Sequence, residues 1–249
     1  MSHVSKIDIL IRAVDQASAQ FKNVGRQVDN LSRKLSGLKD VAKVAAGMLL
    51  RDFAQAAFRS FDESMKLAGE IGTLQKSFER LVQASGKTKI SIEDLRKATK
   101  GAVSDIDLFA AANQAMMLGL PTDKLDELFE AAVRLGSAMQ MTATESIQSL
   151  VTGLGRQSQL ILDNLGVTFQ AADAYEWYAK QLGVTVNQLS EAQRKEAWQA
   201  YAIEQISKKA AVLGDNISET QLAQERWNAS LTNLQTTIGS LLGPLAAIQ

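Results

Sequence analysis

The scarcity of proline constrains this fold most. The chain has 2 Pro among 249 residues, where average usage of about 5% would give roughly 12. Because proline lacks a backbone donor and clashes with the preceding turn, it interrupts helices. Hydrophobic residues make up 46% of the chain and charged residues 22%, as in a globular protein rather than a disordered or membrane-embedded one. We therefore expect an all-α fold.

Reactive side chains are equally scarce. The sequence has no Cys and a single His, His3, and its 27 Lys and Arg balance its 27 Asp and Glu. Thiolate metal sites, cysteine nucleophiles and imidazole-based triads therefore have no residues to form them. A general nucleic-acid binder would carry an excess of basic residues. We expect no enzymatic activity, no cofactor, no metal and no specific nucleic-acid partner.

The most apolar run does not resemble a membrane span. It extends from Val41 to Leu50, contains Lys43 and is followed by Arg51. A bilayer requires about 20 apolar residues, so we expect no membrane segment in this chain.

Residues 1–85 carry the clearest periodic pattern. A short strand or extension at Ile7–Ile11 precedes a long helix that begins near Asp15, with a candidate break at Gly69 and Gly72. Apolar residues recur at spacings of 3 and 4, as at the a and d positions of a heptad. They are Phe21, Val24, Val28, Leu31, Leu35 and Leu38. This first seam predicts pairing with another helix. The net charge of +4 over residues 20–43 fits a solvated face or, alternatively, contact with an acidic surface or DNA.

Residues 86–215 are expected to form a compact helical core domain. Five segments begin with Ser or Thr followed three residues later by an acid or amide, the pattern of a helix capping box. They are Ser91/Asp94, Ser104/Asp107, Thr142/Glu145, Ser190/Gln193 and Ser218/Gln221. Predicted helix ends fall at Gly119-Leu120-Pro121, Gly136, Gly166, Gly183 and Gly214.

Residues 216–249 repeat the heptad pattern in a second coiled-coil-like helix. The second seam consists of Trp227, Leu231, Leu234, Ile238 and Leu241. Gly243-Pro244 is predicted to end the helix. We expect this region to continue in a longer protein.

Several local motifs that resemble binding or catalytic sites are better explained by structural roles. Gly86-Lys87-Thr88 resembles the end of a phosphate-binding loop, but Leu81 stands where the first glycine belongs and no strand precedes it. Gly153-x-Gly155 likewise lacks the strand of a dinucleotide fingerprint. Two acidic pairs are expected to be solvated surface charge: Asp105/Asp107 and Asp126/Glu130. One group of aromatics predicts a helix-packing core: Tyr175, Trp177, Tyr178, Trp198 and Tyr201.

Residues 153–167, GLGRQSQLILDNLGV, resemble the core motif of phage tail tape measure proteins, in which a glycine- and serine-bearing stretch runs into Leu-Asp-x-Leu-Gly. The matching positions are Gly153, Gly155, Ser158, Leu162, Asp163, Leu165 and Gly166. Other segments resemble the family in the same order: the isoleucine-rich opening, Tyr175–Gly183, Leu189–Lys195 and Ile238–Pro244.

The resemblance implies a structural virion protein. Several copies would occupy the lumen of the growing tail tube while tube subunits polymerise around them, so that the chain sets the tail length and is later expelled ahead of the DNA. Expected partners are other copies, the tail tube and tail assembly proteins. Expected locations are the tail lumen and, during assembly, the host cytoplasm.

Length distinguishes this chain from the family, whose members are generally much longer. Even a wholly helical chain of 249 residues would reach only about 370 Å. It could be the front of a longer ruler, a truncated prophage remnant without ruler activity, or the ruler of a short tail. Alternatives of other classes are a cytoplasmic helical coiled-coil adaptor and a hydrolase, which lacks the partners of a nucleophile.

We predict that Leu31→Asp disrupts the first seam, because it places an unpaired charge in a helix–helix contact. Circular dichroism should show lower helicity, and light scattering a smaller oligomer. Unchanged values of both would contradict the predicted pairing.

Overall fold

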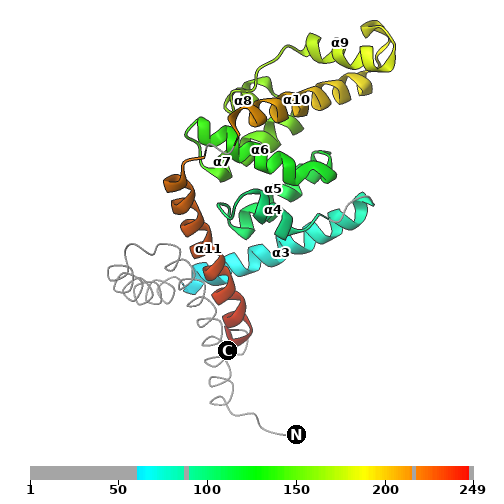
Figure 1. Cartoon of the computed structure of the whole chain (residues 1–249). Helices are drawn as coiled ribbons and strands as arrows, with labels where there is room; N and C mark the ends of the chain where they lie inside the picture. Colours follow the sequence, from blue (N-terminus) through cyan, green and yellow to red (C-terminus); the bar gives the residue numbers. More distant parts are fainter. Residues whose placement is uncertain (1–60, 87–89, 215–216, 247–249) are drawn as a thin grey trace. The chain divides into compact units, whose positions relative to one another are not determined.

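The computed structural model describes residues 61–86, 90–214 and 217–246. These residues form helices joined by turns, which confirms the all-α class (Figure 1). The helices are α3 (Phe61–Ser85), α4 (Ile92–Ala98), α5 (Asp105–Met117), η1 (Thr122–Lys124), α6 (Leu125–Ala138), α7 (Ala143–Gly155), α8 (Gln159–Asp163), α9 (Ala171–Leu182), η2 (Val186–Gln188), α10 (Glu191–Leu213) and α11 (Glu219–Ala246). The predicted strand at residues 7–11 and the first seam lie outside the described residues.

Backbone contacts divide the chain into two units. The helical unit consists of Ile71–Asn233, and the described residues of the terminal unit are 61–70 and 234–246. Helices α3 and α11 each pass from one unit into the other. The core domain expected at residues 86–215 lies within the helical unit, which also includes the second part of α3 and the first part of α11.

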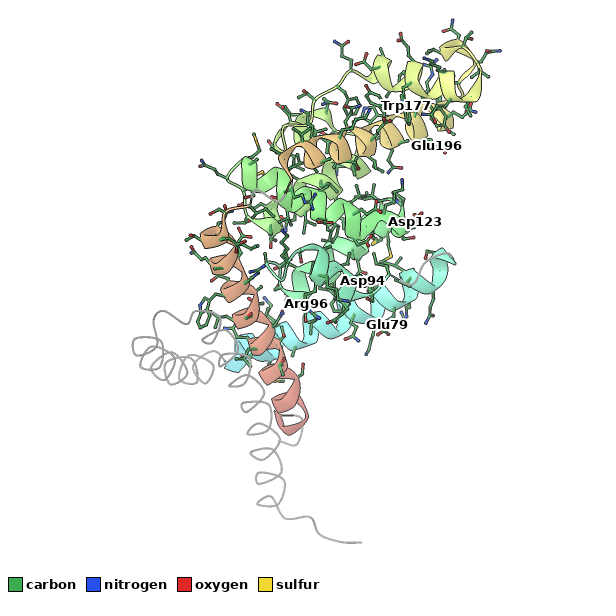
Figure 2. All side chains as sticks on the ribbon, viewed as in Figure 1. Glu79, Asp94, Arg96, Asp123, Trp177 and Glu196 are labelled. Atoms are coloured by element: carbon green, nitrogen blue, oxygen red, sulfur yellow. The ribbon has the colours of Figure 1, made fainter. Side chains whose placement is uncertain are left out.

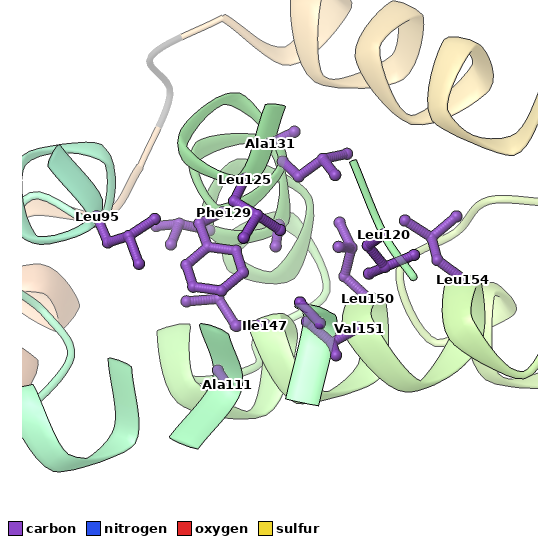
Figure 3. Close-up of a cluster of buried hydrophobic side chains, with 14 of the residues drawn as sticks. Leu95, Ala111, Leu120, Leu125, Phe129, Ala131, Ile147, Leu150, Val151 and Leu154 are labelled. Atoms are coloured by element: carbon purple, nitrogen blue, oxygen red, sulfur yellow. The ribbon is translucent and has the colours of Figure 1, made fainter. Parts of the chain in front are cut away.

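The core of the helical unit is built from α4, α5, α6 and α7. Figure 3 shows Phe129 of α6 among leucine and isoleucine side chains of the neighbouring helices. Phe129, Leu125 and Leu150 are all fully buried. The second part of α3 joins this core through Phe78, whose ring meets the Phe109 ring edge-on with centroids 5.4 Å apart. Burial of this kind of side chain contributes about 1.5–3 kcal/mol each and supplies the main stabilisation of the unit.

All five predicted capping serines and threonines accept a hydrogen bond from the amide three residues later. The five caps are Ser91, Ser104, Thr142, Ser190 and Ser218. At Thr142, the carboxylate of Glu145 also accepts from the threonine amide at 3.0 Å and from its hydroxyl at 2.8 Å. The hydrogen bond from the Thr142 amide, followed by that from its hydroxyl, lowers the pKa of Glu145 below its usual 4.5. Local sequence therefore determines where these helices begin.

Helix ends were predicted correctly at four glycines and wrongly at one. The backbone takes a positive φ at Gly119, Gly166, Gly183 and Gly214. Gly136 instead lies inside α6, where a Cβ atom would fall 1.6 Å from Ser146 Oγ of α7. The missing side chain of Gly136 allows α6 and α7 to approach closely, and the residue does not end α6.

Two further predicted interruptions are also wrong. Helix α3 runs through Gly69 and Gly72, and α11 continues past Gly243-Pro244 to Ala246. A glycine costs a helix only about 1 kcal/mol relative to alanine, which the packing of α3 can offset. Pro244 lies two residues before the end of α11, so only a short stretch of helix depends on the turn it disturbs.

We predict that Thr142→Ala destabilises the protein by about 1 kcal/mol at neutral pH, the usual cost of losing an N-cap hydroxyl. Urea unfolding measures the difference. The matched control is Thr220→Ala in α11, an exposed threonine that caps no helix in the described structure, and it should leave stability nearly unchanged.

The same comparison has an expected pH dependence. Because the folded pKa of Glu145 lies below its unfolded value, the capping box stabilises the fold above about pH 4.5 and loses that contribution as pH falls through the folded pKa. The deficit of Thr142→Ala should therefore shrink in acid. A deficit that stays constant from pH 7 to pH 3 would contradict this assignment.

Candidate interaction sites

Three of the four carboxylates in the acidic pairs considered from the sequence, those of Asp105, Asp107 and Glu130, have structural partners. Asp105 accepts a bidentate pair of hydrogen bonds from Arg96, at 3.1 Å from Nε and 3.0 Å from Nη2. Asp107 accepts from the Ser104 hydroxyl at 2.6 Å, and Glu130 accepts from Arg134 Nη2 at 2.6 Å. These carboxylates fix helix ends and helix surfaces.

Arg96 joins the first turn of α5 to α4 (Figure 2). Partial burial opposes its charged form, but hydrogen bonds to Glu93 and Asp105 outweigh that effect and raise the pKa of the guanidinium. The backbone amide of Asp105 donates to Asn233 Oδ1 of α11 at 2.8 Å. One aspartate thus connects α4, α5 and α11.

The glycine motifs considered for phosphate binding lack the strand that such loops require. Helix α3 ends at Ser85, directly before Gly86, while Lys87 and Thr88 lie outside the described residues. Gly153 and Gly155 lie in the last turn of α7. Within the described part of the chain, no cluster of three or more acidic or histidine side chains could hold a metal ion.

The residues of the glycine- and leucine-bearing motif at 153–167 come together around the α7–α8 turn. A Cβ at Gly153 would lie 2.6 Å from Leu162 Cδ2, and one at Gly155 would lie 2.4 Å from Leu118 Cδ1. Both glycines therefore allow neighbouring leucines to pack directly on the backbone of α7. Leu162 and Leu165 are buried at 0% and 1% exposure.

The polar members of the motif shape the same turn. Ser158 caps α8, accepting from the Ile161 amide at 3.4 Å. Gly166 takes a left-handed φ of +69°, and its carbonyl accepts a hydrogen bond from Lys209 of α10. Asp163 is exposed. The motif is thus a packing element that holds α8 against α7, and the turn after α8 is linked to α10 through Lys209.

The predicted aromatic cluster forms where α9 packs against α10 (Figure 2). The Trp177 ring of α9 lies edge-on to the Tyr201 ring of α10, with centroids 5.6 Å apart. Trp198 is 6% exposed, and Arg194 stacks over the Tyr175 ring at 5.7 Å. Desolvation, followed by a hydrogen bond to Glu196 and that carboxylate's charge, raises the pKa of Tyr178.

Sequence reasoning missed Phe169, although its ring lies at the centre of this cluster. Its centroid is 5.1 Å from that of Trp198 and 5.3 Å from that of Tyr201. Phe169 belongs to the turn before α9 rather than to a helix, so helical periodicity gave no signal for it. A pattern of apolar residues at Leu165, Val167 and Phe169 was the only local indication.

Residues 219–233 of α11 belong to the helical unit and pack on its other helices through a face that sequence reasoning missed. Leu222 and Ala229 are buried at 2% and 6% exposure. Between them, Glu225 accepts from the Ala143 amide at 3.0 Å, and Arg226 Nε donates to the Lys100 carbonyl at 2.7 Å. Polar side chains on this face therefore bind the turns before α5 and α7.

The second seam lies on another face of the same helix. At 3.6 residues per turn, Trp227 and Leu231 are about 140° and 180° around the helix from Leu222. Trp227 is 41% exposed and Leu231 is half-buried. Leu234, also half-buried, belongs to the terminal unit, and the side chains of Ile238 and Leu241 fall outside the described part.

No protein-family model and no solved structure matches this chain. Within the described residues, no helix combines the length and apolarity that a bilayer span needs.

We predict that Gly153→Ala destabilises the helical unit by roughly 1–3 kcal/mol, the usual cost of forcing an extra methyl group into a filled core. Thermal unfolding followed by circular dichroism measures the effect. Gly72→Ala is the matched control, because the space around that helical glycine is open to 4 Å and the substitution should raise stability by up to about 1 kcal/mol. An equal change in thermal stability in the two variants would refute the packing role of Gly153.

Proposed function

We propose that the chain is a structural tail protein of a tailed phage or prophage, acting as tape measure and scaffold for tail-tube assembly. The motif at residues 153–167, in register with the further resembling segments, carries this proposal. Its role in the fold is compatible with a structural protein, since the glycines, leucines and serine of the motif build the packed turn between α7 and α8. Three carboxylates considered as candidates for chemistry, those of Asp105, Asp107 and Glu130, likewise take part in a helix cap or in ion pairs.

Helical structure gives the proposal a physical basis. An α-helix rises about 1.5 Å per residue, so added residues convert directly into added length. Several copies could form a rod through the first seam and through the face that carries Trp227, which is 41% exposed. The partners in this proposal are other copies, the tail tube and tail assembly proteins, in the host cytoplasm and then in the tail lumen.

Changing the number of heptads in the intact gene tests the ruler. Deleting residues 21–48 removes four heptads and keeps the seam in register, so tails should be shorter by about 42 Å at 1.5 Å per residue. Duplicating the same segment is the matched control and should lengthen tails equally. Electron microscopy of purified tails measures both, and tails of unaltered length in both strains would contradict the ruler.

Co-purification distinguishes a tail protein from a cytoplasmic coiled-coil adaptor. A tail protein should be recovered with tail tubes after gradient sedimentation, whereas a cytoplasmic adaptor should remain in the soluble fraction. If the protein is recovered with tails, but neither the deletion nor the duplication alters tail length, the chain is a remnant without ruler activity.

A further inference from the structure

We infer that the exposed face of α7 binds an extended segment of another polypeptide, one that carries basic side chains. Thr144, Gln148 and Thr152, here called the α7 ridge, would contact the backbone of that segment, and two hollows beside the ridge would receive its side chains. Ridge and hollows lie within the helical unit and share no residue with either seam, so this site does not depend on the proposed function.

Two helical hairpins of the helical unit, α4–α5 and α6–α7, stack as repeats of one another. Helix α4 packs on α6, and α5 packs on α7. Helices α5 and α7 are both 13 residues long and begin 38 residues apart, after the capping residues Ser104 and Thr142. Each is followed by a residue with positive φ, Gly119 or Gln157. Stacked two-helix repeats place equivalent helices side by side, which creates extended binding surfaces.

The two hollows lie on opposite sides of the α7 ridge and share Gln148 and Thr152. The first, of about 170 Å³, lies between α5 and α7. Its wall includes Ala111 and Ile147, which belong to the buried cluster of Figure 3. The second, of about 430 Å³, lies between α7 and Ile161 of α8. Because side chains of an extended chain alternate between its two sides, a segment on the ridge would direct them into both hollows.

The ridge carries hydrogen-bonding side chains at regular intervals. Its three residues follow one another every four positions of α7, which is about 6 Å along the helix axis. Groups on one side of an extended chain recur about every 6.7 Å, so its backbone can contact successive ridge residues. The side-chain amide of Gln148 is exposed and makes no hydrogen bond within the described structure. It offers a backbone both donors and an acceptor.

One carboxylate lines each hollow, Asp107 the first and Glu145 the second. Glu145 stays ionised at neutral pH, because hydrogen bonds from Thr142 lower its pKa. Among the described residues that line the two hollows, none is lysine or arginine; Arg156, one turn beyond Thr152, lines neither. Adjacent basic residues of an extended chain would therefore each meet a carboxylate. This charge favours a basic polypeptide and disfavours nucleic acid, whose phosphates require basic contacts.

Synthetic peptides test the site on the full chain by fluorescence anisotropy at physiological ionic strength. The probe is a labelled twelve-residue peptide of three Lys-Lys-Ser-Ser repeats, which should bind. The same peptide with proline for serine keeps the charge but lacks half of the backbone donors, and it should bind about 5-fold more weakly. A peptide with glutamate for lysine should not bind. No binding of the lysine–serine peptide, or equal binding of the proline peptide, would overturn the proposal.

Substitutions locate the binding on α7. Gln148→Ala should weaken binding of the lysine–serine peptide by about 5-fold, through the loss of its hydrogen bonds. Ala110→Trp should also weaken it, because this exposed alanine lines the first hollow. The matched controls are Gln181→Ala and Ala172→Trp at exposed positions of α9, which should leave affinity unchanged. Circular dichroism should stay native in all four variants. Equal affinity in Gln148→Ala and Gln181→Ala would show that the peptide does not bind the α7 ridge.

Discussion

The described structure depends on side chains of one helix that pack directly on the backbone of the next, at positions where only glycine leaves room. Gly136 allows α6 to meet Ser146 of α7, and Gly153 allows α7 to meet Leu162 of α8. These approaches let the side chains around Phe129 fill the interior. Without cysteines, the described fold has no disulfide to hold it, so its stability rests on this packing and on capped helix ends.

Helix beginnings could be predicted from the sequence because a capping box is a contact between residues three apart. The pair Thr142 and Glu145 specifies its own geometry without reference to any other part of the chain. Gly136 could not be interpreted in that way, since its role depends on Ser146, a residue of the next helix. A glycine that ends a helix and one that admits a neighbour look alike in sequence, and only the tertiary contact distinguishes them.

Helix α11 shows a second reason why a site escapes prediction. Periodicity detects apolar residues, so it found the face that carries Trp227 and overlooked the face that binds the helical unit. That binding face holds Leu222 and Ala229, but Glu225, Arg226 and Asn233 make its hydrogen bonds. Attachment through polar groups leaves the strongest apolar pattern of the helix for other contacts, which the proposed function would use between copies.

In a protein proposed to set tail length, residues in packed helices and residues in a single extended helix add different amounts of length. The rise of about 1.5 Å per residue applies along a single helix axis. In the helical unit, consecutive helices pack on one another, as α6 does on α7 at Gly136, so residues added there do not extend one axis. Length would therefore be set by the segments outside residues 71–233.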